Sequence, residues 1–580
     1  MLLQRKMLLR LFVCIAVLFC LIPVASAARF KFVVWGDSQF HHPETFEKIV
    51  RETELLKPAL VLHVGDMIHG YTYDPDVARR EWKRFKKQIS PLTAPFYPTP
   101  GNHDVTTPEI EPIYGETWGK DRYFYSFDFE KNHFIILDVY YKGQFDTLPP
   151  EQLEWLKKDL EKNKEADNIF IAFHSPLHLN NKYDWPSVHK ILRGYPVRAV
   201  FTGHSHIYDY RNLNGIDYFC LNSSGRMSFY NHLLGRSHHF LVVSVEGKEH
   251  SYAVVTQGSI YPADAVPSGS FGRASRYLMD EQTILIPNPS KRPIETTVEV
   301  PVKNRADEKR KFYLSWKTRD HRWQFDPCGA DFELAPGDEK LISFKINGPQ
   351  GNFYRDQLPR LILHSPFRNE KGWETMLSYH YQLFAPPETR AKSLDGGLKI
   401  DGKIEDLAWN KTPAITELYT DTKGTTTPEK NVVKVLYDKE NLYVGIWGEE
   451  PNPAGMSAYA YGDIPLVFGD DDFEIYLDTN RDLKTYYRLM VNPKRVTLAS
   501  GPEGLYSFDF MVKSHIGDSY WSAEFQIPFS ELKTEPPKEG DVWGFNVRRH
   551  RQQAQNVQRD WSKMRNFPYQ PPYFGLLRFD

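Results

Sequence analysis

The sequence predicts an α/β domain followed by two all-β domains, and three features of the chain support this. In residues 28–257, apolar runs of strand length alternate with segments of helical spacing, as in layered α/β domains. From residue 283 to residue 384 the helical period disappears, and runs of β-forming residues are separated by Pro, Gly and Asp. Residues 389–580 are again rich in strand-like runs.

The elements of the first domain follow from the spacing of its apolar residues. Apolar residues three and four positions apart predict helices over 44–56, 77–89 and 151–161. Continuous apolar runs predict buried strands over 31–35, 59–64, 134–139, 168–173 and 197–202, and a hairpin over 239–255. This alternation predicts strands layered against helices.

The later domains are separated by two breaks in composition. Residues 258–282 are rich in Gly, Pro and Ser, as a linker is, and Ala385-Pro386-Pro387 is a second break. We predict strands in the last region over 431–437, 442–447, 473–478, 486–491, 522–528 and 542–547. The predicted segments are a signal peptide (1–27), the α/β domain (28–257), a small β-sandwich spacer (258–388) and a second β-sandwich (389–580).

The composition of the 580 residues is that of a globular protein. It is 41% hydrophobic, 25% charged and 14% aromatic, which argues against long disordered, collagen-like or coiled-coil segments. The formal net charge of −2 gives no basic field that would attract nucleic acid. Only four Cys occur, which excludes a disulfide-stapled scaffold and a Cys-rich zinc module.

The N-terminus carries the features of an export signal. Arg5, Lys6 and Arg10 precede an apolar run, and Ala25-Ser26-Ala27 fits a cleavage site, which would make Ala28 the first mature residue. A membrane anchor is the alternative, but the run is short for a span of about 20 residues. We expect a periplasmic or extracellular protein without a transmembrane span in the mature chain.

Polar residues follow the apolar runs of the α/β domain in a regular order. Each group ends a predicted strand, or a run that could be one, and such ends are where open α/β sheets place their ligands. The groups are Gly36-Asp37-Ser38-Gln39, Gly65-Asp66, Gly101-Asn102-His103-Asp104, His174-Ser175-Pro176 and Gly203-His204-Ser205-His206. A lone Gly-Asp after a strand is more often a turn than a ligand, and a lone His there is more often a capped or hydrogen-bonded His. Five such groups in order predict one site.

The residue types of these groups suit two divalent metal ions. Carboxylate, amide oxygen and imidazole bind Mn, Fe, Zn or Mg in preference to soft metals. Two ions about 3.5–4 Å apart can clamp a phosphate, convert a bridging water into hydroxide and stabilise the leaving oxygen.

The ordered motifs resemble those of the calcineurin-like metallophosphoesterase family, over about residues 30–257. The resemblance implies a four-layer α/β/β/α sandwich and a dinuclear metal site. It implies that Asp37 and His206 bind the first ion, Asp66 bridges, and Asn102, His174 and His204 bind the second. It also implies that His103 protonates or stabilises the leaving group, and that Asp104 orients His103.

One position departs from the family pattern, because Gln39 stands where the first motif has His. Three interpretations are open: Gln39 ligates through its amide oxygen, the first site is weak and prefers Mn or Mg, or the enzyme is inactive. The neighbouring His41 and His42 could supply a ligand instead, or be ordinary loop residues.

The last region resembles the family 9 carbohydrate-binding modules, over about residues 390–580. The resemblance rests on Asp401–Trp409, Asp470–Asp478, Tyr487–Pro493, Trp521–Phe529 and Trp543–Arg549. It implies a β-sandwich that binds carbohydrate, for which Trp561 and Arg549 are the candidate binding residues. Asp470–Asp472 with Glu474 could hold a structural Ca, or form a solvated strand edge.

These features predict an exported dinuclear-metal phosphoesterase that hydrolyses a phosphate ester by metal-hydroxide attack and has a carbohydrate-binding appendage. The expected partners are a phosphate ester and a polysaccharide or other glycan, with no nucleic acid. The alternative is a glycan-binding surface or periplasmic protein whose phosphoesterase domain is weak or inactive. A nucleotidase or cyclic-nucleotide phosphodiesterase is a third possibility, although no nucleoside pocket can be defined.

Overall fold

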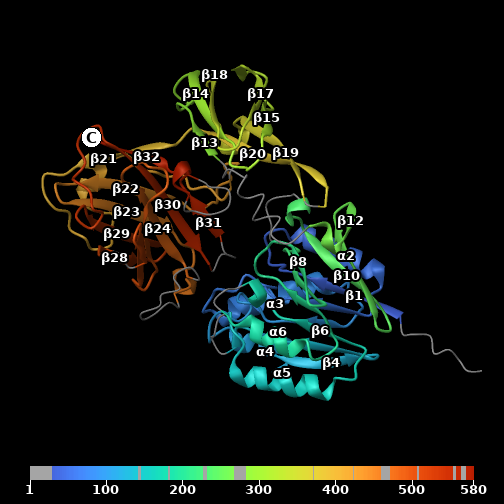
Figure 1. Cartoon of the computed structure of the whole chain (residues 1–580). Coiled ribbons are helices and arrows are strands. Elements are labelled where there is room, and N and C mark those ends of the chain that lie inside the picture. The colour runs from blue at the N-terminus through green and yellow to red at the C-terminus, as the bar shows by residue number, and fades with distance from the viewer. Residues whose placement is uncertain are drawn as a thin grey trace, which may run out of the picture. The chain divides into compact units, whose positions relative to one another are not determined.

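The computed structural model describes residues 29–141, 146–179, 183–225, 232–266, 282–369, 371–421, 423–458, 470–505, 508–552, 557–562 and 570–580. The predicted signal peptide lies outside the described residues. Within those ranges, no helix is long and apolar enough to cross a membrane. The chain divides into two compact units: residues 29–69, 83–105 and 114–266 belong to the first, and 70–82, 106–113 and the described residues from 282 onward belong to the second (Figure 1).

The first unit is built on two six-stranded mixed sheets (Figure 1). One sheet has the order β12 (Ser259–Pro262), β11 (Glu249–Thr256), β10 (His239–Glu246), β1 (Arg29–Trp35), β2 (Leu60–His63), β3 (Phe96–Pro98). The other has the order β4 (Tyr125–Phe129), β5 (Asn132–Ile136), β6 (Asn168–Ala172), β7 (Val197–Thr202), β9 (Ile216–Cys220), β8 (Asp209–Leu213). β1, β2 and β3 run parallel, as do β5, β6 and β7.

Strand β1 shows how the layers of this unit arise. The Phe32 ring lies 5.3 Å from Phe134 and 5.0 Å from Phe170, which belong to the other sheet. The Trp35 ring points to the opposite face and lies 5.4 Å from Phe46 of helix α2 (Pro43–Leu56). Because successive side chains of a strand alternate between faces, β1 contributes to the core between the sheets and to the helix layer.

Helices cover the outer face of each sheet. α2 and α3 (Pro75–Ile89) lie on the first sheet, where Phe46, Phe85 and His63 meet. α5 (Pro150–Lys162) and α6 (Trp185–Leu192) lie on the second. The three predicted helices are present within two residues of their expected ends, and the predicted α/β class is confirmed. The eight-residue helices α4 (Glu111–Trp118) and α6 were not predicted.

The second unit contains two β-sandwiches. The middle one pairs a sheet of order β13 (Gln282–Leu285), β20 (Glu374–Phe384), β19 (Arg360–Arg368), β15 (Arg310–Lys317), β17 (Gly329–Leu334) with a sheet of order β14 (Ile294–Lys303), β18 (Glu339–Gly348), β16 (Gln324–Asp326). Trp316 and Phe344 join the two sheets, with ring centroids 5.5 Å apart. All the strand pairs of this sandwich are antiparallel except β13 with β20.

The last sandwich closes through strand β21 (Glu388–Ser393), which pairs with β22 (Asn431–Tyr437) on one side and β32 (Gly575–Phe579) on the other. Its other strands are β23 (Asn441–Glu449), β24 (Asp472–Asp478), β25 (Tyr487–Val491), β26 (Thr497–Gly501), β27 (Gly504–Leu505), β28 (Met511–Ile516), β29 (Tyr520–Pro528), β30 (Val542–Arg551) and β31 (Val557–Asp560). The Phe473 and Trp521 rings stack at 4.0 Å in the core. The predicted all-β class of this region is confirmed.

Candidate metal centre

The polar groups that follow the parallel strands meet at one edge of the two sheets. Asp37 follows β1, Asp66 follows β2, His174 follows β6, and His204 follows β7. The carboxyl ends of parallel strands face the same direction, so side chains distant in sequence converge there. The motif order thus has a geometric cause.

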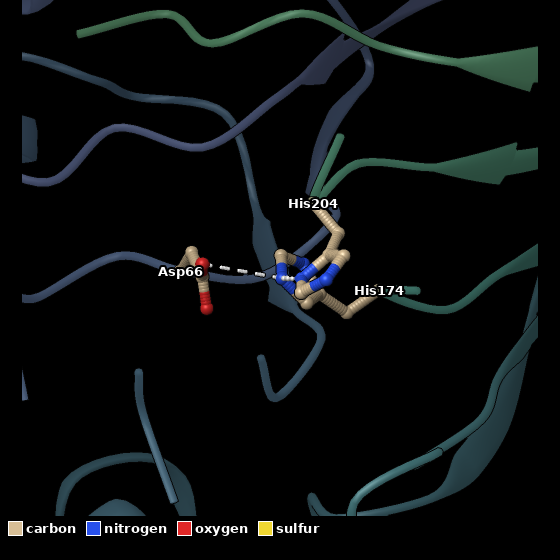
Figure 2. Close-up of side chains that lie close together, drawn as sticks. All are labelled: Asp66, His174 and His204. Atoms are coloured by element: carbon tan, nitrogen blue, oxygen red, sulfur yellow. Dashed lines mark hydrogen bonds and ion pairs between the residues drawn. The ribbon is translucent and has the colours of Figure 1, made fainter. Parts of the chain in front are cut away.

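One cluster of donor atoms has the spacing of ligands around a single ion; Figure 2 shows three of its side chains, those of Asp66, His174 and His204. Asn102 Oδ1 lies 3.1 Å from His174 Nε2 and 2.9 Å from His204 Nδ1. His174 Nε2 lies 3.3 Å from His204 Nδ1 and 3.2 Å from Asp66 Oδ2. Neighbouring ligands of an ion with bonds of about 2.1 Å lie about 3 Å apart, so the cluster fits a divalent cation.

A second cluster shares Asp66 with the first. Asp37 Oδ2 lies 2.8 Å from His206 Nε2, and one ligand atom each of Asp37, Asp66 and His206 falls within 4.8 Å of the others. Because the Asp66 carboxylate belongs to both clusters, it occupies the position of a bridging ligand. Among the described residues these are the two carboxylate–histidine groups that could hold a metal ion.

Burial strengthens the electrostatic interactions among the charged groups at this edge of the sheets. Burial alone would raise the pKa of Asp37, but the His206 ring outweighs it and holds the pKa at about 2. Burial lowers the pKa of His174, yet the adjacent Asp66 carboxylate outweighs it and raises the pKa to about 9. In the metal-free protein the two carboxylates therefore lie beside a protonated His174 at neutral pH.

Metal binding at this edge is expected to release protons. A coordinating imidazole must be neutral, and His174 carries its proton below about pH 9, so binding at pH 7.5 should release about one proton from it. The release should fade as the pH rises through 9. Titration calorimetry of the metal-depleted protein with Mn²⁺, in buffers of different ionisation enthalpy, measures this number; a value near zero at pH 7.5 would contradict the assignment.

Gln39 lies beside Asp66, and one of its two amide atoms forms a hydrogen bond there. Its side chain is fully buried, and its Nε2 donates to Asp66 Oδ2 at 3.3 Å. Its Oε1 has no hydrogen-bond partner among the described residues. A buried amide oxygen without a partner is costly, and the two ends of an amide exchange by a half-turn. After such a half-turn, the Gln39 oxygen faces Asp66 and can bind a cation that Asp66 also binds. This arrangement fits a ligand role for Gln39.

His103 is held at the rim of the two clusters by a backbone group. Its Nδ1 bonds to the carbonyl oxygen of His69, and its backbone N–H donates to Asp66 Oδ1 at 2.9 Å. The remaining ring nitrogen, Nε2, lies 3.8 Å from Asp66 Oδ2. His103 therefore presents Nε2 toward the bridging position, as a leaving-group residue requires.

The contacts of Asp104 differ from the expected contact with His103. Its carboxylate accepts the backbone N–H groups of Asp66, Met67, Ile68 and Gly101, at 2.8 to 3.3 Å. The group that orients the His103 ring is the His69 carbonyl instead. Asp104 thus ties the loop of Asp66 to the loop of Asn102.

Close backbone approaches hold the same loops. A Cβ on Gly101 would lie 2.3 Å from Asp66 Oδ1, so only glycine fits there. Ser223 Oγ and Ser224 N–H both donate to the carbonyl oxygen of Asp37. The segment 222–225 thus caps the backbone of the Asp37 loop.

The structure also fixes the positions of Tyr140, His41 and His42 near the site. The sequence did not indicate Tyr140, and it left the roles of His41 and His42 open. The Tyr140 hydroxyl lies 3.0 Å from Asp146 Oδ1 and 3.5 Å from His204 Nδ1, and its position after β5 was the available signal. The His41 ring packs on His69, and His42 packs on His238. His41 and His42 belong to neither metal cluster of the described residues.

The last sandwich corrects a prediction about its surface, that of Arg549. Arg549 is 1% exposed and bonds to Asn431 and Glu450, because β30 is buried along nearly its whole length. Trp561 is also mostly buried and packs against Phe545. Arg549 therefore forms no open binding face, whereas Trp561 lines a cleft beside the middle sandwich.

The acidic run Asp470–Asp472 with Glu474 is buried, and Glu474 has arginine partners. Its carboxylate pairs with Arg488 at 2.6 Å and Arg548 at 4.0 Å inside the sandwich. The predicted alternative of a solvated strand edge is wrong, since all four acidic residues are buried. The physical cause is that β24 lies between β25 and β30, whose Arg488 and Arg548 compensate Glu474. Asp472 pairs instead with His550 at 3.2 Å, and Asp470 accepts from the Asn492 amide at 2.9 Å.

Comparisons with known proteins assign both ends of the chain to families. Residues 30–208 match the family model described as calcineurin-like phosphoesterase. Residues 400–576 match the model described as carbohydrate family 9 binding domain-like. The chain therefore contains a calcineurin-like phosphoesterase domain and a family 9 carbohydrate-binding-like domain, as the motifs predicted.

Curated relatives match part of the chain. The chain is 29% identical over 162 residues to acid phosphatase type 7 of Homo sapiens, covering 26% of this chain and 36% of that protein. It is 31% identical over 124 residues to a probable glycerophosphodiester phosphodiesterase GpdQ of Arcobacter nitrofigilis, covering 21% of this chain and 43% of that protein. The matches span less than half the length of these relatives.

Solved structures resemble each end. A dimetal phosphatase from Danio rerio aligns with a TM-score of 0.32 and 15% identity, over 40% of this chain and 98% of its own. A family 9 carbohydrate-binding module from Caldicellulosiruptor kristjanssonii, in complex with cellotriose, aligns with a TM-score of 0.26 and 19% identity. The alignment covers 33% of this chain and 93% of that module.

Proposed function

We propose that the protein is an exported phosphoesterase that uses two divalent metal ions, Mn, Fe, Zn or Mg, to hydrolyse a phosphate ester. The observation that carries the proposal is the convergence of two buried donor clusters on Asp66 at the edge of the sheets. The ligands would be Asp37, Gln39 and His206 for one ion, Asn102, His174 and His204 for the other, and Asp66 for both.

The side chains of the site divide the chemistry among them. Two bound cations supply positive charge for the phosphoryl oxygens and acidify water. Asp66 holds the two ligand clusters together, and Asp104 fixes the loops that carry Asp66 and Asn102. As the P–O bond of the ester breaks, His103 donates a proton from Nε2 to the leaving oxygen, while Nδ1 stays bonded to the His69 carbonyl.

The other parts of the chain support export and carbohydrate binding. The leader predicts translocation, and the family match of residues 400–576 supports a sugar ligand for the last domain. We propose the segments 28–257, 258–388 and 389–580 as three domains, with the middle one between the enzyme and the carbohydrate-binding domain. The substrate would then be presented near a glycan.

Gln39 motivates the alternative of a glycan-binding protein with a weak or inactive phosphoesterase domain. Metal analysis separates the two functions. Two tightly held ions per chain support the enzyme, whereas fewer than two, combined with retention on a glycan gel, support the binding protein.

The proposal is tested by metal-dependent turnover. The purified chain, depleted with a chelator and resupplied with Mn²⁺, is expected to hydrolyse p-nitrophenyl phosphate or bis-p-nitrophenyl phosphate. Asn102→Ala and His206→Ala should each lower kcat/KM by about 10²–10³. His321→Ala, an exposed histidine of the middle sandwich, is the control. Absence of turnover, or turnover that survives both site variants, would refute the enzyme.

A further inference from the structure

A large cleft lies inside the second unit, where the middle sandwich meets the last one. We call it the junction cleft; its volume is about 710 Å³, within the range of ligand-binding cavities. Both sandwiches supply aromatic and polar side chains to its wall, among them Asn352, Tyr354, Phe384, Tyr419, Trp561 and Ser562. Aromatic rings beside hydroxyl and amide groups suit a sugar, which has an apolar ring face and a polar edge.

Tyr354 is the exposed aromatic ring of this wall, and the structure holds it in place. Its side chain is 40% exposed, and its ring lies edge-on to Tyr419 with centroids 5.8 Å apart. A Cβ on Gly424 would lie 2.1 Å from Tyr354 Cε1, so the ring rests directly on the glycine backbone. A ring fixed before binding loses little entropy when a ligand stacks on it.

The charged side chains of the junction cleft already have partners: Arg355 lies over the Tyr573 ring, Glu417 accepts from the Tyr419 hydroxyl, and Asp421 accepts from the Thr425 hydroxyl. Glu388 pairs with Lys291 at 2.7 Å and with Arg578 at 3.3 Å. Arg390 pairs with Asp580 at 2.6 Å. The wall therefore favours a neutral part of a ligand over an isolated anion.

A second cleft of about 860 Å³ adjoins the first and has a basic wall; we call it the basic cleft. The loop residues Asn352, Phe353 and Leu358 border both clefts. The charged residues of the basic cleft are Lys317, Arg319, Arg322, Arg360 and Lys423, against Asp320 and Asp356.

Two of these cations are already compensated. Arg322 pairs with Asp320 at 2.7 Å, and Arg360 lies 3.5 Å from Asp356. Lys317 and Arg319 are exposed and form no ion pair with any residue in the described ranges. The basic cleft thus offers positive charge to a ligand anion.

We propose that the two clefts bind one acidic polysaccharide, with sugar rings against Tyr354 and its anionic groups against Lys317 and Arg319. This rests on the proposed carbohydrate binding and assigns it a site that includes the middle sandwich. Uronate and phosphate groups share the required charge, and the experiment separates them. A phosphate-bearing glycan would also carry an ester for the phosphoesterase domain.

The test is affinity electrophoresis of the full chain in gels that contain matched polysaccharides. Each acidic polymer is paired with a neutral form of the same backbone: polygalacturonate with its methyl ester, and phosphomannan with the dephosphorylated mannan. We expect stronger retardation by the acidic form of at least one pair, decreasing as the ionic strength rises. The pair that responds identifies uronate or phosphate.

Variants locate the binding. Tyr354→Ala should weaken retardation about tenfold, and Gly424→Ala should weaken it by displacing the ring without removing it. The matched control is Trp373→Ala, an aromatic of similar exposure on the same sandwich. Lys317→Ala with Arg319→Ala should abolish the preference for the acidic form, whereas Lys303→Ala with Arg305→Ala, a Lys and an Arg at the same spacing, should not.

Each outcome decides the proposal. Retardation that is equal for acidic and neutral forms, or that is unchanged by the cleft variants, overturns it and leaves carbohydrate binding elsewhere on the chain. No retardation by any of the four polymers overturns both the cleft and the carbohydrate part of the function. The phosphoesterase assay is independent of all these results.

Discussion

Replacing Asp66 by Asn is expected to lower kcat/KM for p-nitrophenyl phosphate by about 10³-fold or more. The Asp66 carboxylate belongs to both donor clusters and lies 3.2 Å from His174 Nε2. Asn keeps the shape of the side chain but removes the negative charge, and its NH₂ group would face the cations. One substitution therefore weakens both metal positions, whereas a change at any other ligand weakens one.

The measurement is steady-state turnover with excess Mn²⁺, together with the number of ions retained after gel filtration. Asp76→Asn is the matched control, because Asp76 is an exposed carboxylate at the start of α3. Urea unfolding of the variant checks that it folds. If Asp66→Asn keeps two ions and activity within about tenfold of the wild type, Asp66 is not a bridging ligand.

The sequence predicted the position of the site because the site is made by strand ends. Apolar runs identified β1, β2, β6 and β7, and the polar residues that follow them met at one edge. Those residues are recognisable by type, since carboxylate and imidazole side chains have few other reasons to follow buried strands in this order.

What the sequence could not predict are contacts made by backbone atoms. The His69 carbonyl orients His103, and four backbone N–H groups hold Asp104. Every residue has such a carbonyl and nearly every residue such an N–H, so no residue type marks them in the chain. The role expected for Asp104 was wrong for this reason.

The buried charged residues of the last sandwich show a second limit of prediction from the sequence. Arg551 pairs with Glu450 at 2.7 Å, 101 positions away, and Arg548 pairs with Asp560 at 2.7 Å. Charged side chains are rarely buried without such partners. The Glu450 partner of Arg549 is also distant in sequence. Arg549 was therefore predicted to lie on the surface, whereas the structure buries it.

Gln39 offers the sharpest test of how the first ion is held, because two substitutions should act in opposite directions. Gln39→His restores an imidazole, a better ligand for these ions than an amide, and should slow the loss of the first ion to a chelator by about tenfold or more. Gln39→Ala removes the unpartnered Oε1 and should speed that loss about 10–100-fold, with lower activity at limiting Mn²⁺.

The pair of variants distinguishes the interpretations of Gln39. Gln350→Ala, in a loop of the second unit, controls for loss of an amide. If Gln39→Ala retains both ions as the wild type does, then Asp37, Asp66 and His206 hold the first ion alone. If Gln39→His creates activity that the wild type lacks under all metals, the natural chain is an inactive phosphoesterase. Ligation by Gln39 requires an active wild type with an ion affinity between those of the two variants.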